Sequence, residues 1–264
     1  MNFRICISLF LVCCLLSPVM AQRDKNKQKE VTVKAMTYNT YSGRKQGIDK
    51  IAEVIKQEDP DIVSLQEIER NTEINPWNTP ERLSVLTGMK YYYFAHALDI
   101  PTGGDYGNVI LSKFPISEEK SFKLSVLKEN DYVRSFGYVK VMKEGKEFYF
   151  ATTHLDHKYE DAARLKQVDE ILACVEHLDK PVILGGDLNS RRGSATMAAF
   201  QKYFTVNCLS DAAPWTVPVP SPTYTCDWLI YAPNEAFTVK AYNVCYWADK
   251  ESDHYPVVAT YLIK

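Results

Sequence analysis

Apolar and polar positions alternate near the start of the chain, and the pattern stops at polar side chains. Residues 31–38 follow the pattern of a strand with one buried face, and Asn39 comes next. Over residues 48–55 the apolar positions recur at helical spacing. Residues 61–65 form another short apolar run, which leads to Glu67. A strand, a helix and a strand in so short a span predict a βαβ-like unit within a mixed sheet.

A buried strand is predicted near the middle of the domain, at residues 182–184. It stops at Gly185 and Gly186, which permit a sharp backbone turn, and Asp187 and Asn189 follow. At a spacing of two, both polar side chains can face the same side. A carboxylate beside a carboxamide suits a site that handles water, metal or phosphate. An Asx-stabilised turn explains this stretch alone equally well, but polar clusters at the other strand ends favour a functional site.

The remaining pattern predicts mostly strands. Residues 160–178 form the longest helix candidate, and shorter helices are predicted at 83–86 and 194–204. Strands are predicted at residues 91–97, 108–112, 147–153, 226–231, 237–246 and 255–263, and they dominate 122–149 around a hairpin turn at 143–146. Many strands and few helices predict an α/β fold of two sheets packed face to face, with helices outside. We expect the loops at 71–80, 100–106 and 206–222 to shape a pocket.

The first residues have a different pattern. Arg4 precedes an apolar run at residues 5–16, and small side chains follow before Gln22. This run is shorter than the roughly 20 residues of a membrane-spanning helix. A lipoprotein signal at Cys13 or Cys14 is the alternative, but neither cysteine follows the small residue that such processing favours. The predicted parts are a signal peptide at residues 1–21, a flexible leader at 22–30 and one domain at 31–264, which predict a secreted or periplasmic protein.

Charge and cysteine content narrow the function classes. The formal net charge of -2 lacks the basic excess of proteins that grip long duplex DNA, although it does not exclude a local basic patch. Four cysteines follow the signal, and in an oxidising compartment they allow one or two disulfides whose pairing stays open. No CxxC pair is present, so a structural zinc site is not indicated. These four cysteines are Cys174, Cys208, Cys226 and Cys245.

Seven short motifs, in this order, resemble the endonuclease/exonuclease/phosphatase (DNase I-like) family over residues 31–264. They are Tyr38-Asn39, Leu65-Gln66-Glu67, Gly107-Asn108 with Leu111-Ser112-Lys113-Phe114-Pro115, Thr153-His154-Leu155, Gly185-Gly186-Asp187-Leu188-Asn189-Ser190, Asp227-Trp228, and Ser252-Asp253-His254-Tyr255-Pro256-Val257. The resemblance implies a four-layer α/β/β/α sandwich of two mixed sheets, with the active site at one end of the sheets. It also implies hydrolysis of a phosphoester assisted by a divalent metal, Mg²⁺ or Mn²⁺.

The metal ligands that the resemblance implies are Asn39, Glu67 and Asp253. Their side chains offer hard oxygen atoms, which suit Mg²⁺ or Mn²⁺ rather than zinc. A surface carboxylate at a strand end is the alternative for Glu67. The presence of Asn39 and Asp253 in the same chain favours the metal site.

The resemblance assigns the catalytic roles to residues of three later motifs. Asp187 would orient or deprotonate the attacking water, and Asn189 would hold a phosphate oxygen. His254 would hydrogen-bond the scissile phosphate, while Asp227 would fix the tautomer of His254 and favour its charged form. Family members usually have an aliphatic residue where this chain has Cys226, a departure that affects packing more than chemistry.

Three further residues resemble family positions near the substrate. His154 is shared with DNase-like and lipid-phosphodiesterase-like branches, whereas the abasic-site DNA repair branch has Tyr. Arg134 resembles a phosphate-contacting arginine, with surface solvation as the alternative, and Asn108 resembles a substrate-side asparagine. Roles in substrate choice, in loop structure or on the surface stay open for Asp156, His157 and Arg164.

The resulting hypothesis is a secreted, metal-dependent phosphoester hydrolase that acts on a small or lipid-like phosphodiester or phosphomonoester. A secreted DNase- or RNase-type endonuclease is the alternative, so a nucleic acid partner is allowed but not favoured. A second alternative is a non-catalytic binding protein on the same fold. We expect a monomer without a membrane span.

Overall fold

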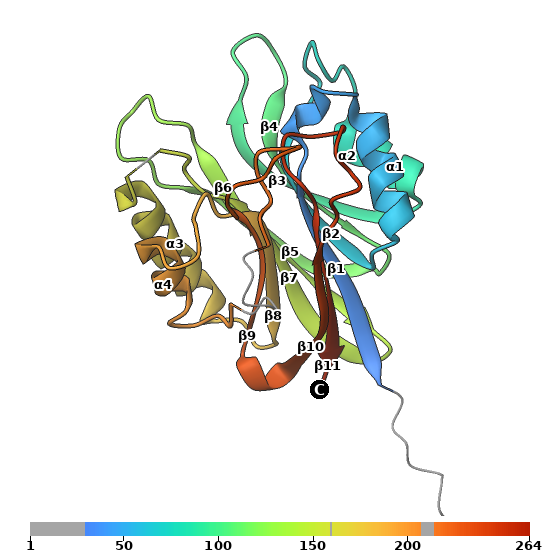
Figure 1. Cartoon of the computed structure of the whole chain (residues 1–264), viewed down its shortest axis with the longest axis vertical. Coiled ribbons are helices and arrows are strands. Elements are labelled where there is room, and N and C mark those ends of the chain that lie inside the picture. Colours follow the sequence, from blue (N-terminus) through green and yellow to red (C-terminus); the bar gives the residue numbers. More distant parts are fainter. Residues whose placement is uncertain (1–29, 159, 207–213) are drawn as a thin grey trace, which may run out of the picture. The chain divides into compact units, whose positions relative to one another are not determined.

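The strand, helix and strand expected at the start of the domain are present as β1 (Val31–Asn39), α1 (Ile48–Glu58) and β2 (Ile62–Arg70). The computed structural model describes residues 30–158, 160–206 and 214–264, and Val31–Lys264 form one compact unit. The predicted signal peptide and leader lie outside the described residues, apart from Glu30. Within this unit two sheets pack face to face (Figure 1).

Both sheets are mixed. In the first, β1 runs parallel to β2 and the other pairs are antiparallel; in the second, β7 and β8 are the parallel pair. The first sheet has the order β10 (Phe237–Val244), β11 (Val257–Ile263), β1, β2, β4 (Asp105–Ser112), β3 (Tyr91–Asp99). The second has the order β5 (Ile116–Leu124), β6 (Arg134–Lys143), β7 (Lys146–His154), β8 (Val182–Asp187), β9 (Asp227–Ala232).

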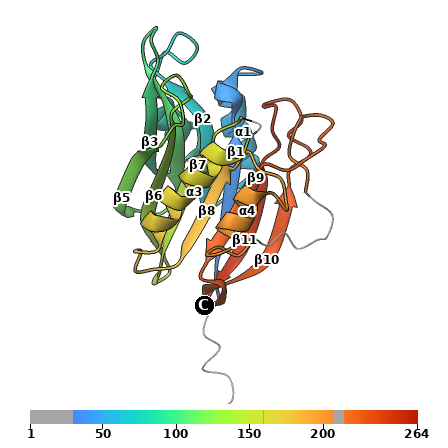
Figure 2. The same cartoon turned by 90° about the vertical axis from the view of Figure 1, so that its left-hand side faces the viewer.

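Helices cover the outer faces of the two sheets. On the first sheet, α1 and α2 (Thr79–Thr87) bury residues such as Ile51 against Met36. On the second sheet, α3 (Ala162–Val175) and α4 (Ala195–Phe200) bury Val168 against Leu184, and Figure 2 shows both helices lying across this sheet. Short 3₁₀ turns occupy Tyr41–Gly43 and Asn234–Ala236. The layers are α/β/β/α, as expected.

A third apolar cluster fills the space between the sheets, with Val33, Ile183 and Tyr261 fully buried in it. Near one end of this interface the packing becomes polar. The hydroxyl of Ser64 on β2 donates to the carbonyl of Gly185 on β8 at 2.9 Å and lies 2.7 Å from the Thr152 hydroxyl on β7. Because these groups are buried, each needs a partner, and here the partner comes from the opposite sheet.

The expectation that Gly185 and Gly186 turn the chain is wrong, because both lie inside β8. Their missing side chains allow close approach instead. A Cβ at Gly186 would meet the backbone oxygen of Thr153 at 2.4 Å, and a Cβ at Gly185 would meet the Cβ of Ser64 at 3.0 Å. The chain turns only after the strand, where Asn189 has a left-handed φ of 46°.

We predict that Gly186→Ala lowers the free energy of unfolding by about 1–3 kcal/mol, since the new methyl must displace the backbone of β7. Gly185→Ala is the matched comparison, because its methyl would meet side-chain atoms at longer distances. We expect a smaller loss there. Urea unfolding of both variants measures the difference, and an equal or reversed order contradicts this account of the close packing.

Candidate active site

Polar side chains from both sheets meet where the expected strand ends converge. Asn39 ends β1 and Asp187 ends β8, while Asp227 begins the antiparallel β9. The Nδ2 of Asn39 donates to the Oδ2 of Asp187 at 3.0 Å, so a hydrogen bond joins the two sheets at this edge. His254 lies in the segment before β11 and adds its ring to the same edge.

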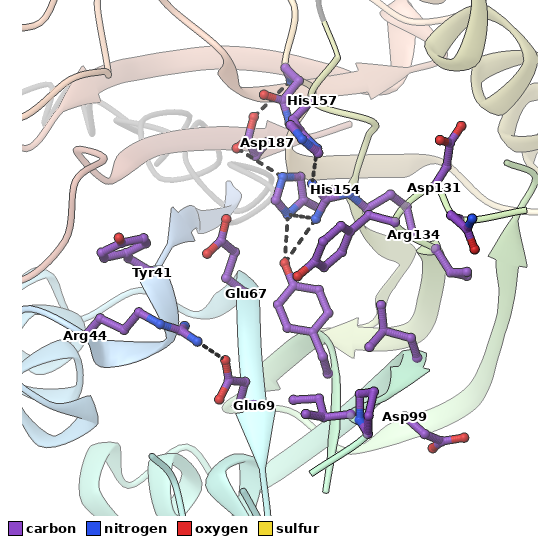
Figure 3. Close-up of a pocket in the computed structure, with 18 of the residues that line it drawn as sticks. Tyr41, Arg44, Glu67, Glu69, Asp99, Asp131, Arg134, His154, His157 and Asp187 are labelled. Atoms are coloured by element: carbon purple, nitrogen blue, oxygen red, sulfur yellow. Dashed lines mark hydrogen bonds and ion pairs between the residues drawn. The ribbon is translucent and has the colours of Figure 1, made fainter. Parts of the chain in front are cut away.

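A pocket of about 930 Å³ opens over this edge (Figure 3). Among the predicted site residues, six line it: Glu67, Arg134, His154, Asp187, Asn189 and His254. Of the loops expected to shape it, 100–106 contributes Ile100, Pro101 and Tyr106, whereas no described residue of 71–80 or 206–222 lines it. Residues 129–133, between β5 and β6, form another part of the wall. Residues 207–213 lie outside the described residues.

Glu67 sits at an irregular point of β2. The register between β2 and β4 shifts between Leu65 and Ile68, and Glu67 has a left-handed φ of 59°. A bulge of this kind re-aims a side chain, and a left-handed conformation is costly for a residue with a Cβ. The hydroxyl of Ser42 donates to the Glu67 carbonyl at 2.9 Å and helps to hold this conformation.

Asn39 bridges two carboxylates. Besides Asp187, its Nδ2 donates to the Oε1 of Glu67 at 3.2 Å, while its Oδ1 accepts from the backbone N–H of Tyr41 at 3.1 Å. Rotating the amide by 180° would present the oxygen in place of the nitrogen with little other movement. The Glu67 carboxylate and an amide oxygen of Asn39 are hard donors, which fit Mg²⁺ or Mn²⁺.

The Asp187 carboxylate is almost fully buried and lies between two imidazoles. Its Oδ2 is 3.4 Å from the Nε2 of His154 and 3.9 Å from the Nε2 of His254. Its Oδ1 accepts from the backbone N–H of Asn189 at 2.9 Å. Burial, followed by the charge of Asp227, raises the pKa of Asp187 to about 6, against the opposing effect of His254.

His254 is paired with a fully buried carboxylate. Its Nδ1 lies 2.9 Å from the Oδ2 of Asp227, which also accepts from the Thr216 hydroxyl at 2.6 Å. Burial alone would lower the pKa of His254, but Asp227 and then Asp187 outweigh it and raise the pKa to about 10. The ring is therefore an imidazolium at neutral pH, and its Nε2–H is aimed toward the Asp187 side.

His154 has the opposite character. Burial, followed by the charge of Arg134, lowers the pKa of His154 well below its usual value. The Nη1 of Arg134 lies 3.0 Å from the Nδ1 of His154 and 3.0 Å from the Tyr106 hydroxyl. Since a guanidinium only donates, Nδ1 is the acceptor and the ring proton sits on Nε2, facing Asp187.

Arg134 is buried without a carboxylate partner among the described ion pairs, and its Nε has no hydrogen-bond partner within the described residues. Its Nη2 lies 3.3 Å from the Nδ1 of His157, which also lines the pocket. An uncompensated buried cation beside a pocket favours an anionic ligand.

The other predicted residues lie differently. Asn108 is buried and donates to the Ser135 carbonyl at 3.0 Å, and neither it nor Asp253 lines the pocket. Their predicted roles are not tested by these positions. Arg164 donates to the Asp156 carbonyl at 3.0 Å and pairs with Asp161 at 2.7 Å, so it holds the loop after β7. Asp156 forms a turn that accepts from the Lys158 N–H.

Sequence reasoning missed two contributors to the site, Tyr106 and Thr216. Tyr106 falls in the predicted loop 100–106, yet it is the second residue of β4 and lies buried against Arg134. Its place directly before Gly107-Asn108 was the available signal. Thr216 lies in a segment without recognised motifs, so nothing in the sequence marked it as a partner of Asp227.

No disulfide joins the cysteines that the structure describes. Cys174, Cys226 and Cys245 are free thiols, and Cys208 lies outside the described residues. Burial, followed by the charges of Asp187 and Asp227, raises the pKa of Cys226 well above its ordinary value. A thiol that stays protonated is a poor nucleophile.

Comparison with known proteins identifies the family. A model of the endonuclease/exonuclease/phosphatase family matches residues 36–254. The chain belongs to this family. Its members are phosphoester hydrolases that generally depend on a divalent metal, and the resemblance seen in the seven motifs is thereby confirmed. No helix within the described residues is both long and apolar enough to cross a membrane.

Individual relatives are distant. Phospholipase C from Staphylococcus aureus is 31% identical over 116 residues, which span 39% of this chain and 35% of that protein. An endonuclease/exonuclease/phosphatase structure from Beutenbergia cavernae shares 23% identity with a TM-score of 0.77 over 88% of this chain and 72% of that one. A mannosyl-6-phosphatase structure from Bacteroides thetaiotaomicron shares 21% identity with a TM-score of 0.65, over 88% and 100%. These structures show the same fold.

We predict that His154 is neutral at pH 7, with its proton on Nε2. Two-bond ¹H–¹⁵N NMR spectra should show an unprotonated Nδ1, with protonation only well below pH 6.5 because burial disfavours the cation. In Arg134→Met the guanidinium donor to Nδ1 is lost and the Tyr106 hydroxyl, 3.4 Å from Nδ1, remains, so the tautomers should redistribute. An imidazolium signal for His154 at pH 7 would contradict this arrangement.

Proposed function

We propose that the protein is a secreted, divalent-metal-dependent hydrolase of phosphodiesters or phosphomonoesters of small or lipid-like molecules. The observation that carries the proposal is the pairing at the pocket edge of the Asp187 carboxylate with the His254 imidazolium, beside the uncompensated Arg134. A base next to two cations suits attack by water on an anionic centre. Secretion rests on the sequence of residues 1–21 alone.

Asp187 is the group that takes the proton of the attacking water. With a pKa of about 6 it is mostly ionised at neutral pH, yet basic enough to accept a proton. Its contacts to Asn39 and to the Asn189 N–H fix the orientation of the carboxylate. General-base help of this kind contributes typically about 10²–10⁴-fold to a rate.

His254 and Arg134 stabilise the negative charge that grows on the phosphoryl oxygens. The imidazolium is held charged by Asp227, and its position is fixed by that hydrogen bond before substrate arrives. Arg134 is equally fixed by Tyr106 and His154. Donors that are already oriented need no reorganisation during the reaction, which makes their stabilisation of the transition state larger.

The residues that would hold a divalent metal are Glu67 and Asn39, with Asp253 predicted as a third ligand from the sequence. Bound there, Mg²⁺ or Mn²⁺ supplies Lewis-acid stabilisation of a phosphoryl or leaving oxygen. The strained backbone of Glu67 and the Asn39 bridge between two carboxylates support this position.

The pocket wall favours small or lipid-like esters over a polynucleotide. Away from the reaction centre, its described lining residues include four carboxylates and one arginine, so a chain of phosphates would meet repulsion there. Leu98, Ile100, Pro101 and Val133 give the wall an apolar part. The names of the S. aureus phospholipase C and of a Leptospira interrogans sphingomyelinase C, 31% identical over 101 residues, point in the same direction.

Hydrolysis tests the proposal directly. The panel contains a bis-aryl phosphodiester, an aryl phosphate, phosphatidylinositol phosphates, sphingomyelin, RNA and plasmid DNA, each with Mg²⁺ and with EDTA. We expect Mg²⁺-dependent turnover of a small or lipid ester, and a loss of about 10²–10⁴-fold in kcat for Asp187→Asn.

Asp131→Asn is the matched control, because Asp131 lines the same pocket but pairs with Lys158. It should keep kcat within a few-fold. Preferred hydrolysis of plasmid DNA would refute the substrate class, and a folded protein without turnover on any compound would favour a binding protein.

We also predict that Glu67→Gln raises the Mg²⁺ concentration for half-maximal turnover by about tenfold or more, since the metal loses a charged oxygen ligand. Glu69→Gln serves as the comparison: Glu69 lines the pocket from the same strand but pairs with Arg44 at 2.5 Å. Titrating Mg²⁺ in the hydrolysis assay measures both. An equal shift in the two variants would show that bulk charge, rather than ligation by Glu67, sets the requirement.

A further inference from the structure

A thiol lies against the Asp227–His254 pair. The Sγ of Cys226 is 3.5 Å from the Oδ2 of Asp227 and 3.7 Å from the Nδ1 of His254. Together with a carboxylate oxygen of Asp187, these potential ligand atoms all lie within 4.8 Å of one another. Thiolate, imidazole and carboxylate are the ligand types of zinc, whereas the predicted Mg²⁺ ligands are all oxygens.

The spacing of the three atoms fits a zinc ion. Ligand atoms around a tetrahedral zinc lie about 3.3–3.6 Å apart, because the bonds to zinc are about 2.0–2.3 Å long. The two contacts of the Cys226 sulfur are already close to this length. Only the contact between His254 and Asp227 is shorter, at 2.9 Å, because a proton joins those atoms. If the ion replaces that proton, the distance between the His254 nitrogen and the Asp227 oxygen has to lengthen by about 0.5 Å.

One carboxylate oxygen of Asp227 lacks a hydrogen-bond partner among the described residues. Its Oδ2 accepts from Thr216, His254 and the Cys226 thiol, but its buried Oδ1 has no hydrogen-bond partner within the described residues. A buried carboxylate oxygen without a partner is costly and would be satisfied by a cation. Neither Cys174 nor Cys245 belongs to a group of three potential ligands in the described part of the chain.

We propose that Cys226, His254 and Asp227, with Asp187 as a fourth ligand, form a zinc site that inhibits the enzyme. Zinc reaches it from the pocket, which His254 and Asp187 line. Binding forms a Zn–S bond and a Zn–N bond, and it releases the thiol proton of Cys226 and the Nδ1 proton of His254 to solvent. His254 is thereby separated from Asp227, and Asp187 is withdrawn from the attacking water.

The site goes beyond the proposed function, and only its inhibitory effect rests on that function. Binding is therefore measured without substrate, by titrating the purified protein with Co²⁺ and then displacing it with Zn²⁺. Cobalt bound to a thiolate shows charge-transfer absorption in the near ultraviolet. We expect one such cobalt per chain in the parent protein and loss of the band in Cys226→Val. In a competition with a chromogenic chelator, Cys226→Val should bind zinc about tenfold or more weakly than the parent.

Cys174→Val and Cys245→Val are matched controls that should keep the band, and Cys208→Ser tests the cysteine outside the described residues. Valine replaces the thiol by an apolar group of similar size, and Cys226 has no part in the proposed hydrolysis, so Mg²⁺-dependent turnover should persist in Cys226→Val. No cobalt band in the parent protein, or an unchanged band in Cys226→Val, overturns the site.

Inhibition is measured with buffered Zn²⁺ at saturating Mg²⁺, on the best substrate of the panel. We expect half-inhibition of Cys226→Val to need about tenfold more zinc than half-inhibition of the parent. Equal inhibition of both proteins overturns the inhibitory role. A protein that hydrolyses nothing on the panel but shows the cobalt band, lost in Cys226→Val, contradicts the proposed function and still supports the metal site.

Discussion

The site depends on one contact between the two sheets, the hydrogen bond from Asn39 on β1 to Asp187 on β8. Both residues end a strand of a parallel pair, so each sheet brings its own polar edge to the same place. The approach is close because Gly185, two residues before Asp187, has no side chain to keep Ser64 away. Packing deep between the sheets thus sets the distance between groups that act at their edge.

Burial then gives similar groups different properties. Two histidines flank Asp187, and both are nearly enclosed. His254 is an imidazolium because its Nδ1 meets the carboxylate of Asp227, whereas His154 is neutral because burial, and then the guanidinium of Arg134 at its Nδ1, disfavours the charged ring. Burial disfavours the charge on both rings, and only the carboxylate partner of His254 overcomes it. One base, one acid and one neutral donor arise within a single cluster.

Sequence patterns located the strands and their polar ends well, because burial and alternation are local properties of β1, β2 and β8. The sequence patterns failed where the role of a residue depends on a neighbouring strand or on a distant side chain. Gly185 and Gly186 resembled a turn, yet neighbouring strands require them inside β8. The left-handed backbone of Glu67 likewise arises from the pairing of β2 with β4. The burial of Tyr106 arises from its contact with Arg134. Distant partners of this kind leave no local signal.

Because the groups around His254 lie close together, the unusual residue Cys226 can change which metal they bind. An aliphatic side chain beside Asp227 would leave the imidazolium with one role, pairing with that carboxylate. Cys226 places a sulfur, a soft metal ligand, next to the Nδ1 of His254, although its side chain does not line the pocket. A hard metal at Glu67 and a soft one at Cys226 would then use separate ligands. They would come close at Asp187, which contacts both Asn39 and His254.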